Sequence, residues 1–125
     1  MSYNGISLGK AGEESAAHFL RTKGYTIIQT NYRTRYAEID IIADHCNTLV
    51  FIEVKTRKTN FLETPLAAVT INKQRHISMA AQLYLSSKNL FDKDARFDVI
   101  AVYLGGGTSQ RIEHIENAFE LNFGF

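Results

Sequence analysis

The chain has 125 residues, of which 45% are hydrophobic and 22% charged, and its net charge at pH 7 is +1. This length suits a single domain, residues 1–125, with a hydrophobic core, and the near-neutral charge does not by itself indicate a nucleic-acid partner. One cysteine, Cys46, excludes an internal disulfide. No apolar run has the length of a membrane span and the N-terminus has no signal-peptide core, so we expect a cytoplasmic protein.

The first element predicted is a helix from about Leu8 to Lys23, whose apolar residues recur at helical spacing. We expect residues 1–7 to be flexible, with Ser7 as the N-terminal cap. Gly24 suits the position that ends the helix, because glycine adopts the left-handed conformation without strain.

Three strands are predicted next, at Tyr25–Tyr32, Ala37–Ala43 and Leu49–Arg57. Asp44–Asn47 has the composition of a turn, so the second and third strands are expected to form a hairpin. Because side chains alternate along a strand, Ile39 and Ile41 should share one face of the sheet, and the opposite face should carry Glu38, Asp40 and Ile42.

The second half of the chain begins with a helical segment at Thr64-Pro65, followed by a longer helix capped by Asn72 and ending near Ser87. Strands are predicted at Arg96–Leu104 and Arg111–Glu116, joined at Gly105–Gly107, and the residues from Asn117 onward should form a short helix or a docked tail. The order helix, three strands, helix, two strands predicts an α/β fold with a mixed five-stranded sheet flanked by helices (αβββαββ).

Two charged residues interrupt the apolar strand Leu49–Arg57. Glu53 and Lys55 are two residues apart and therefore point to the same face, together with Phe51 and Arg57. Charges in a buried strand are costly unless they are paired or bind a metal ion. One interpretation is an edge-strand ion pair that is partly in water; the other is a functional site.

Asp40 favours the functional interpretation, because it interrupts the neighbouring apolar strand in the same way. Asp40, Glu53 and Lys55 would then converge from adjacent strands. Two carboxylates, a backbone carbonyl and water molecules suit a hard cation such as Mg²⁺. A lysine beside them could help to deprotonate a water molecule and offset the charge of a phosphate, which is the equipment for metal-assisted phosphodiester hydrolysis.

The pattern Asp, then Glu-x-Lys on the next strand, resembles the PD-(D/E)xK nuclease superfamily, whose core has the helix and strand order predicted here. More closely, the chain resembles the YraN family, small bacterial proteins similar to archaeal Holliday-junction resolvases. This resemblance rests on motifs in matching order and spacing, namely GxxGE at 9–13, NYR at 31–33, AEIDIIA at 37–43, FIEVKTR at 51–57, AAV at 67–69, Lys73 and RFDVIAV at 96–102.

The resemblance implies a restriction-endonuclease-like fold and a Mg²⁺- or Mn²⁺-dependent DNA endonuclease acting on branched or junction DNA. It also implies the residue roles. Asp40 and Glu53 would bind the metal directly with the Val54 carbonyl, Glu13 would complete the metal site, and Lys55 would be the catalytic lysine. A non-catalytic nucleic-acid-binding or assembly module that keeps the same fold is the alternative.

Basic residues are the candidate DNA contacts, because phosphate backbones attract them. Residues 1–75 hold ten Lys/Arg and seven Asp/Glu, a net charge of +3, whereas residues 76–125 hold four and six, a net charge of −2. Tyr32 and Tyr36 could stack on an unpaired base. The basic candidates near the predicted site are Arg33, Arg35, Arg57, Lys58, Lys73 and Arg75.

Two further features carry expectations. Asp98 is another charge in an apolar strand, and an ion pair with Arg96 on the same face accounts for it. The C-terminal residues are a candidate homodimer surface, because two symmetric cuts in a junction require two active sites. Folding of the tail onto its own core is the alternative. The apolar residues concerned are Ala118, Phe119, Leu121, Phe123 and Phe125.

Overall fold

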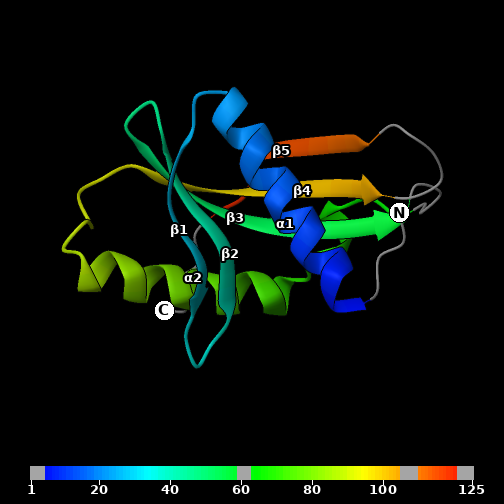
Figure 1. Ribbon diagram of the computed structural model, residues 1–125. Helices are drawn as coiled ribbons and strands as arrows, with labels where there is room; N and C mark the ends of the chain where they lie inside the picture. Colours follow the sequence, from blue (N-terminus) through cyan, green and yellow to red (C-terminus); the bar gives the residue numbers. More distant parts are fainter. Residues whose placement is uncertain (1–4, 59–62, 105–109, 121–125) are drawn as a thin grey trace.

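The computed structural model describes residues 5–58, 63–104 and 110–120 of the chain (Figure 1). Two helices, one short 3-10 turn and five strands follow one another in the order expected from the sequence. Their bounds are α1 Gly5–Thr22, β1 Thr26–Arg33, β2 Glu38–His45, β3 Thr48–Lys58, η1 Leu66–Ala68, α2 Ile71–Ser87, β4 Ala95–Leu104 and β5 Arg111–Phe119. None of the described helices is both long enough and apolar enough to cross a membrane.

The five strands form one mixed sheet in the order β1-β2-β3-β4-β5. Strands β1, β2 and β3 are antiparallel neighbours, β3 and β4 run parallel, and β5 returns antiparallel to β4. The α2 segment makes the crossover that a parallel pair requires. The structure therefore confirms the predicted α/β class and the mixed five-stranded sheet.

The helices cover opposite faces of this sheet (Figure 1). On one face, Ala16 and Leu20 of α1 pack with Val50 and Ile52 of β3. On the other face, α2 packs against Phe51 and neighbouring strand residues. The predicted inward residues of α2 are confirmed as buried, namely Ile77, Ala80, Ala81, Tyr84 and Leu85. The strands β3 and β4 are thus covered on both faces, which explains the apolar runs at 49–52 of β3 and 99–104 of β4.

Both predicted helix starts need correction. α1 begins at Gly5, so Ser7 lies inside the helix and is not its cap, and of the segment expected to be flexible only residues 1–4 lie outside the described residues. α2 begins after Thr70, whose hydroxyl accepts the backbone N–H of Lys73 at 3.2 Å, and Asn72 lies within the helix. A threonine one residue before a helix competes well as a cap, and extended backbone at Thr70 allows it.

Strand ends differ from the prediction by more than one residue at two places, the ends of β2 and β5. The β2–β3 turn consists of Cys46 and Asn47 alone, both with left-handed backbone (φ 51° and 62°), as two-residue hairpin turns require. Strand β5 continues to Phe119, so of the two alternatives expected from Asn117 onward, a short helix or a docked tail, the helix does not form at 117–119. Phe119 stacks on Phe97 at 4.6 Å between ring centroids.

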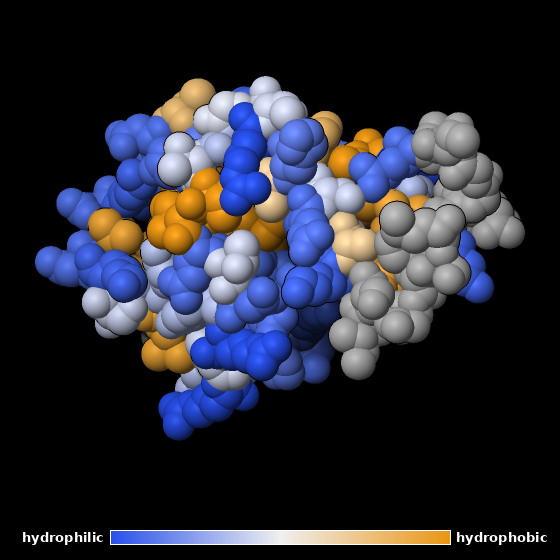
Figure 2. Space-filling view, viewed as in Figure 1, coloured by the Kyte–Doolittle hydropathy of each residue, from blue (hydrophilic) through white to orange (hydrophobic). Residues whose placement is uncertain are grey.

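The predicted apolar tail surface is reduced by this packing, because Ala118 and Phe119 pack against the α2-side core cluster. Its remaining members at 121–125 and the predicted glycine turn at 105–107 lie outside the described residues. On the face seen in Figure 2, hydrophilic residues cover most of the surface and apolar residues form separate patches. Scattered apolar patches of this kind are normal for a protein surface.

One prediction of strand alternation is wrong. Ile41 packs into the α1-side cluster, whereas Ile39 packs with Ile42 into the α2-side cluster, so Ile39 and Ile41 do not share a face. The irregularity centres on Asp40. Residue pairing between β2 and β3 ends at Ile41 and Ile52, and Asn31, in the β1 segment beside Asp40, has a left-handed φ of 52°. The chain leaves regular alternation where the sheet opens around Asp40.

Candidate metal centre

Asp40 lies at the point where β2 and β3 separate. Its side chain replaces the missing strand partner, because Oδ2 accepts the backbone N–H of Val54 at 2.7 Å. Only 9% of Asp40 is exposed. A buried carboxylate is thereby fixed at the fork between two strands, with one backbone donor to stabilise its charge.

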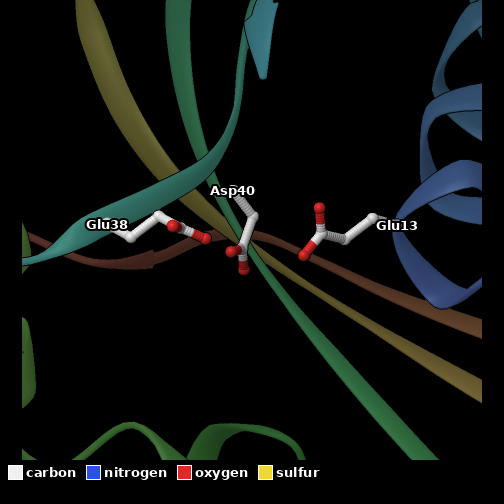
Figure 3. A group of neighbouring side chains, drawn as sticks. All are labelled: Glu13, Glu38 and Asp40. Atoms are coloured by element: carbon white, nitrogen blue, oxygen red, sulfur yellow. The ribbon is translucent and has the colours of Figure 1, made fainter. Parts of the chain in front are cut away.

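Three carboxylates converge at this fork. Oxygen atoms of Glu13, Glu38 and Asp40 lie within 4.8 Å of one another, and Figure 3 shows the Asp40 side chain between Glu38 of the same strand and Glu13 of α1. Asn31 of β1 joins two of them, since Nδ2 donates to Glu13 Oε1 at 2.9 Å and to Glu38 Oε1 at 3.4 Å. Carboxylate oxygens at this spacing are the ligands that Mg²⁺, Mn²⁺ and Ca²⁺ take.

A close contact between α1 and β3 allows Glu13 to reach the sheet. A Cβ atom built on Gly12 would lie 2.0 Å from Thr56 Oγ1, so no larger residue fits there without displacement. Glycine at position 12 lets the helix approach the strand, and the next residue, Glu13, then faces Asp40. The GxxGE motif thus has a physical role in assembling the carboxylate cluster.

Glu53 stands beside this cluster but is paired with lysines. Its Oε1 atom lies 3.2 Å from the Lys55 ammonium and 2.9 Å from the Lys73 ammonium of α2. Glu53 is 9% exposed, while the side chains of Lys55 and Lys73 are 14% and 40% exposed. The carboxylate is therefore almost buried, and one of its two cations reaches it from the surface.

The unbalanced charges shift the ionisation of the site. Burial, followed by repulsion from Glu53, Glu13 and Glu38, raises the pKa of Asp40 to about 7, although the Val54 N–H opposes the shift. Burial and the neighbouring Lys73 lower the pKa of Lys55 despite the attraction of Glu53. Burial also disfavours the charge of Lys73, but contacts with Lys55 and Glu53 outweigh it and raise the pKa of Lys73.

The structure brings together Glu13 and Asp40, and separately Glu53 and Lys55, of the residues predicted for the site. Val54 contributes its backbone N–H to Asp40. Sequence reasoning missed Glu38 as a member of the carboxylate group, although its position two residues before Asp40 was a usable signal. An all-oxygen donor set with a buried, destabilised carboxylate fits a divalent cation held by Glu13, Glu38 and Asp40, with Glu53 adjacent.

The predicted DNA contacts lie in different surroundings. Arg33 is 78% exposed in its side chain and pairs through Nε with Glu38 Oε2. Arg35 donates to the Tyr36 hydroxyl at 2.9 Å, and Arg57 donates to the Thr56 carbonyl at 3.2 Å. Lys58 and Arg75 are exposed. Lys73 contacts a residue of the predicted catalytic set, Glu53.

Tyr32 lies at the edge of the α2-side core, and its stacking role stays a prediction. Its ring packs edge-on against Tyr84 of α2 at 5.3 Å between centroids and belongs to the edge of the α2-side core. Tyr36 is half-buried and lies beside Arg35, with the guanidinium 5.0 Å from its ring centroid, so it keeps an accessible edge.

Comparison with known proteins places this chain in a protein family. The family model described as "Uncharacterised protein family UPF0102" matches residues 12–102, a range that includes both Glu13 and Lys73. The chain belongs to the UPF0102 family.

Similar family members cover nearly the whole chain. The UPF0102 protein of Geobacter sulfurreducens is 48% identical over 122 residues, which is 98% of this chain and 95% of that protein. The UPF0102 protein of Geobacter metallireducens is 46% identical and covers 98% of this chain and 100% of its own length. The UPF0102 protein of Chlorobium phaeobacteroides is 50% identical over 95% of this chain and 98% of that protein.

Proposed function

We propose that this protein is a Mg²⁺- or Mn²⁺-dependent DNA endonuclease with a restriction-endonuclease-like fold and a preference for branched or junction DNA. The observation that carries the proposal is Asp40, a nearly buried carboxylate among three other acidic side chains, with its pKa raised to about 7. Clustered carboxylates repel one another unless a cation joins them, so this arrangement is favoured by a function that requires one.

The residues of the site have complementary roles in this proposal. Glu13, Glu38 and Asp40 would hold the cation, with Glu53 as a further ligand on its β3 side. When bound, the divalent cation supplies a polarised water molecule and neutralises the phosphate that is attacked. Lys55 lies beside Glu53, and burial together with Lys73 lowers its pKa, which is the direction that would help a lysine to take a proton from water.

Preference for DNA shape over base sequence follows from the basic residues. The exposed cations Arg33, Lys58 and Arg75 are suited to phosphate oxygens, and Arg33 lies beside Glu38 of the site. Phosphate contacts position a nucleic acid without reading its bases. Two symmetric cuts in a junction would require two copies of the protein, so the proposal includes a homodimer on DNA.

One observation favours the alternative of a non-catalytic binding module. Glu53 is already neutralised by Lys55 and Lys73, so this carboxylate needs no metal for its charge to be compensated. The two functions differ in whether a divalent cation leads to cleavage of the DNA. A binding module would bind DNA equally well in chelator and in Mg²⁺ and would leave it intact.

The test is cleavage of a panel containing duplex, single-stranded, flap and four-way junction DNA, each with Mg²⁺, Mn²⁺ or chelator. We expect cleavage that requires a cation. Asp40→Ala, Glu53→Ala and Lys55→Ala should each lower its rate by about 10²-fold or more while the protein stays folded. Asp92→Ala, which removes an exposed carboxylate in the loop before β4, is the matched control. Equal cleavage by all three site variants would exclude this site as the nuclease centre.

The proposed dimer has its own measurement. Light scattering with and without a four-way junction should give two protein copies per junction. A strict monomer with one copy per junction would leave a nicking or binding role, because paired cleavage needs two centres.

A further inference from the structure

Glu53 is shared between two ammonium groups that come from different parts of the fold. Lys55 follows it by two residues on β3, whereas Lys73 reaches it from the first turn of α2, and both approach the same oxygen, Oε1, at 3.2 and 2.9 Å. A carboxylate required for metal binding under the proposed function is thus occupied by a cation of the protein itself.

The start of α2 holds Lys73 in place. The Thr70 hydroxyl accepts the Lys73 backbone N–H at 3.2 Å, and the Gln74 side chain donates to the Val69 carbonyl at 3.0 Å. Val69 is 2% exposed and belongs to the α2-side core cluster. The backbone of Lys73 is therefore anchored through its neighbours, and its position beside Glu53 follows from the packing of the helix.

The side chain of Lys73 is freer than its backbone. It is 40% exposed, against 14% for Lys55, so its ammonium has more access to solvent. Lysine has a flexible stem and a compact charge, and it binds carboxylate and phosphate oxygens alike. Lys73 can thus exchange the Glu53 carboxylate for the phosphate of a bound nucleic acid.

We propose that Lys73 competes with the divalent cation for Glu53 and that a DNA phosphate displaces it, so that metal loading is coupled to substrate binding. This inference rests on the proposed function. An ammonium 2.9 Å from Glu53 repels an incoming divalent cation and must be moved or compensated before Glu53 becomes a ligand. A phosphate beside the site offers Lys73 another anion. Because linkage is reciprocal, metal must then strengthen DNA binding by the same factor.

The coupling has a functional consequence. Without DNA the Lys73–Glu53 ion pair keeps the metal affinity low, and with DNA the same lysine contributes to substrate binding. The protein would therefore assemble its complete metal centre mainly on its substrate. Lys73 is in this view a positioning residue that acts on the metal through Glu53.

The first test is Mn²⁺ binding to the DNA-free protein, followed by the electron paramagnetic resonance signal of free Mn²⁺. Lys73→Met, which keeps the apolar stem and removes the charge, should bind Mn²⁺ roughly threefold to tenfold more tightly than the parent. Lys73→Gln should change affinity in the same direction. The control is Lys88→Met, which removes one positive charge about 22 Å away at the other end of α2 and should leave the affinity within about twofold.

The second test repeats the Mn²⁺ titration with a short DNA duplex, after subtraction of the Mn²⁺ bound by the duplex alone. DNA should increase the Mn²⁺ affinity of the parent and increase that of Lys73→Met by a clearly smaller factor. DNA affinity measured by fluorescence anisotropy, with and without Mn²⁺ at low temperature, should show the same difference.

The possible results distinguish failure of the Lys73 competition from failure of the proposed nuclease function. If the parent binds Mn²⁺ and Lys73→Met leaves the affinity unchanged or weakens it, the competition is wrong while the nuclease proposal stands. An equal effect of DNA on both proteins would overturn the coupling. If the parent binds no Mn²⁺ with or without DNA, the proposed function falls and the inference falls with it.

Discussion

Asp40 and Asp98 are both nearly buried aspartates on interior strands of the same sheet, yet their environments are opposite. Asp98 is 1% exposed and accepts hydrogen bonds from Arg96 at 3.0 and 3.3 Å, from His114 at 2.7 Å and from the Asn117 backbone at 3.0 Å. Burial alone would raise the pKa of Asp98, but these donors outweigh it and lower the pKa. Asp40, by contrast, accepts the backbone N–H of Val54 and has three acidic neighbours, and its pKa rises.

The Asp98 cluster extends into a network that joins three elements. Arg96 also donates to the Tyr25 hydroxyl at 2.7 Å, and the Lys23 ammonium lies 2.8 Å from His114 Nδ1. Because Nδ1 accepts from the ammonium, the His114 proton resides on Nε2 and is donated to Asp98. The network ties the end of α1 to β4 and β5.

The difference between Asp98 and Asp40 illustrates two roles of a buried charge, stabilising the fold and binding a ligand. A carboxylate whose acceptor sites are filled by donors stabilises the fold once formed, and removing it leaves its partners unsatisfied. A carboxylate held among other carboxylates destabilises the fold and is retained where a ligand needs it. On this criterion the Asp98 cluster is structural and the Asp40 cluster is the candidate site.

The largest effect on stability should come from Asp98→Ala. Loss of this carboxylate leaves Arg96 and His114 buried without their acceptor, which should lower the free energy of unfolding by about 3–5 kcal/mol. Urea denaturation followed by circular dichroism measures it. A loss below about 1 kcal/mol would contradict the structural assignment, and Asp92→Ala in an exposed loop is the control.

The second-largest effect should be on the pH dependence of stability, which should distinguish Asp40 from Asp98. The pKa of Asp40 is about 7 in the folded protein, against an ordinary value of 3.8. The contribution of protonated Asp40 to the free energy of unfolding is therefore fully present below pH 4 and is lost as the pH rises through 7. In chelator, the parent should therefore lose stability relative to Asp40→Asn between pH 4 and pH 7.5. The loss is at most about 4 kcal/mol, and urea titrations at each pH measure it. A constant difference between the two proteins would mean that Asp40 ionises normally.

Bound metal should reduce the destabilisation caused by the Asp40 cluster and so make it more similar to the stabilising Asp98 cluster. In chelator at pH 7.5, Asp40→Asn should melt at or above the parent temperature, because it relieves repulsion from Glu13, Glu38 and Glu53. Added Mg²⁺ should raise the melting temperature of the parent by several degrees and that of the variant by less. A variant that melts several degrees lower in chelator would instead identify Asp40 as a structural residue.

The smallest effects should be those of the DNA-contact variants. Arg33→Ala, Arg57→Ala and Lys73→Ala should each reduce the slope of log affinity against log salt concentration by about one unit or less, since each removes a phosphate contact. Fluorescence anisotropy at several salt concentrations measures this slope. Arg111→Ala on β5 serves as the control, and unchanged slopes in all three variants would move the binding surface away from the Asp40 side of the sheet.

Local pattern was sufficient for much of the molecule. The apolar periodicities predicted both helices, all five strands and the buried face of α2, and the two-residue spacing predicted the Arg96–Asp98 and Glu53–Lys55 pairs. These features depend on residues close in sequence, and their geometry follows from the regular repeat of a helix or a strand.

Tertiary structure decided the features that join distant segments. The carboxylate group requires α1 to meet β2, and the small residue at Gly12 allows that approach. The break in alternation occurs at Asp40, whose side chain binds a backbone donor of β3, and no periodicity in the sequence contains that contact. Lys73 meets Glu53 only because α2 packs beneath the sheet. The sequence by itself determined which residues carry charge within apolar strands. The packing of the helices determined which of those charges are paired with an opposite charge and which lie beside like charges.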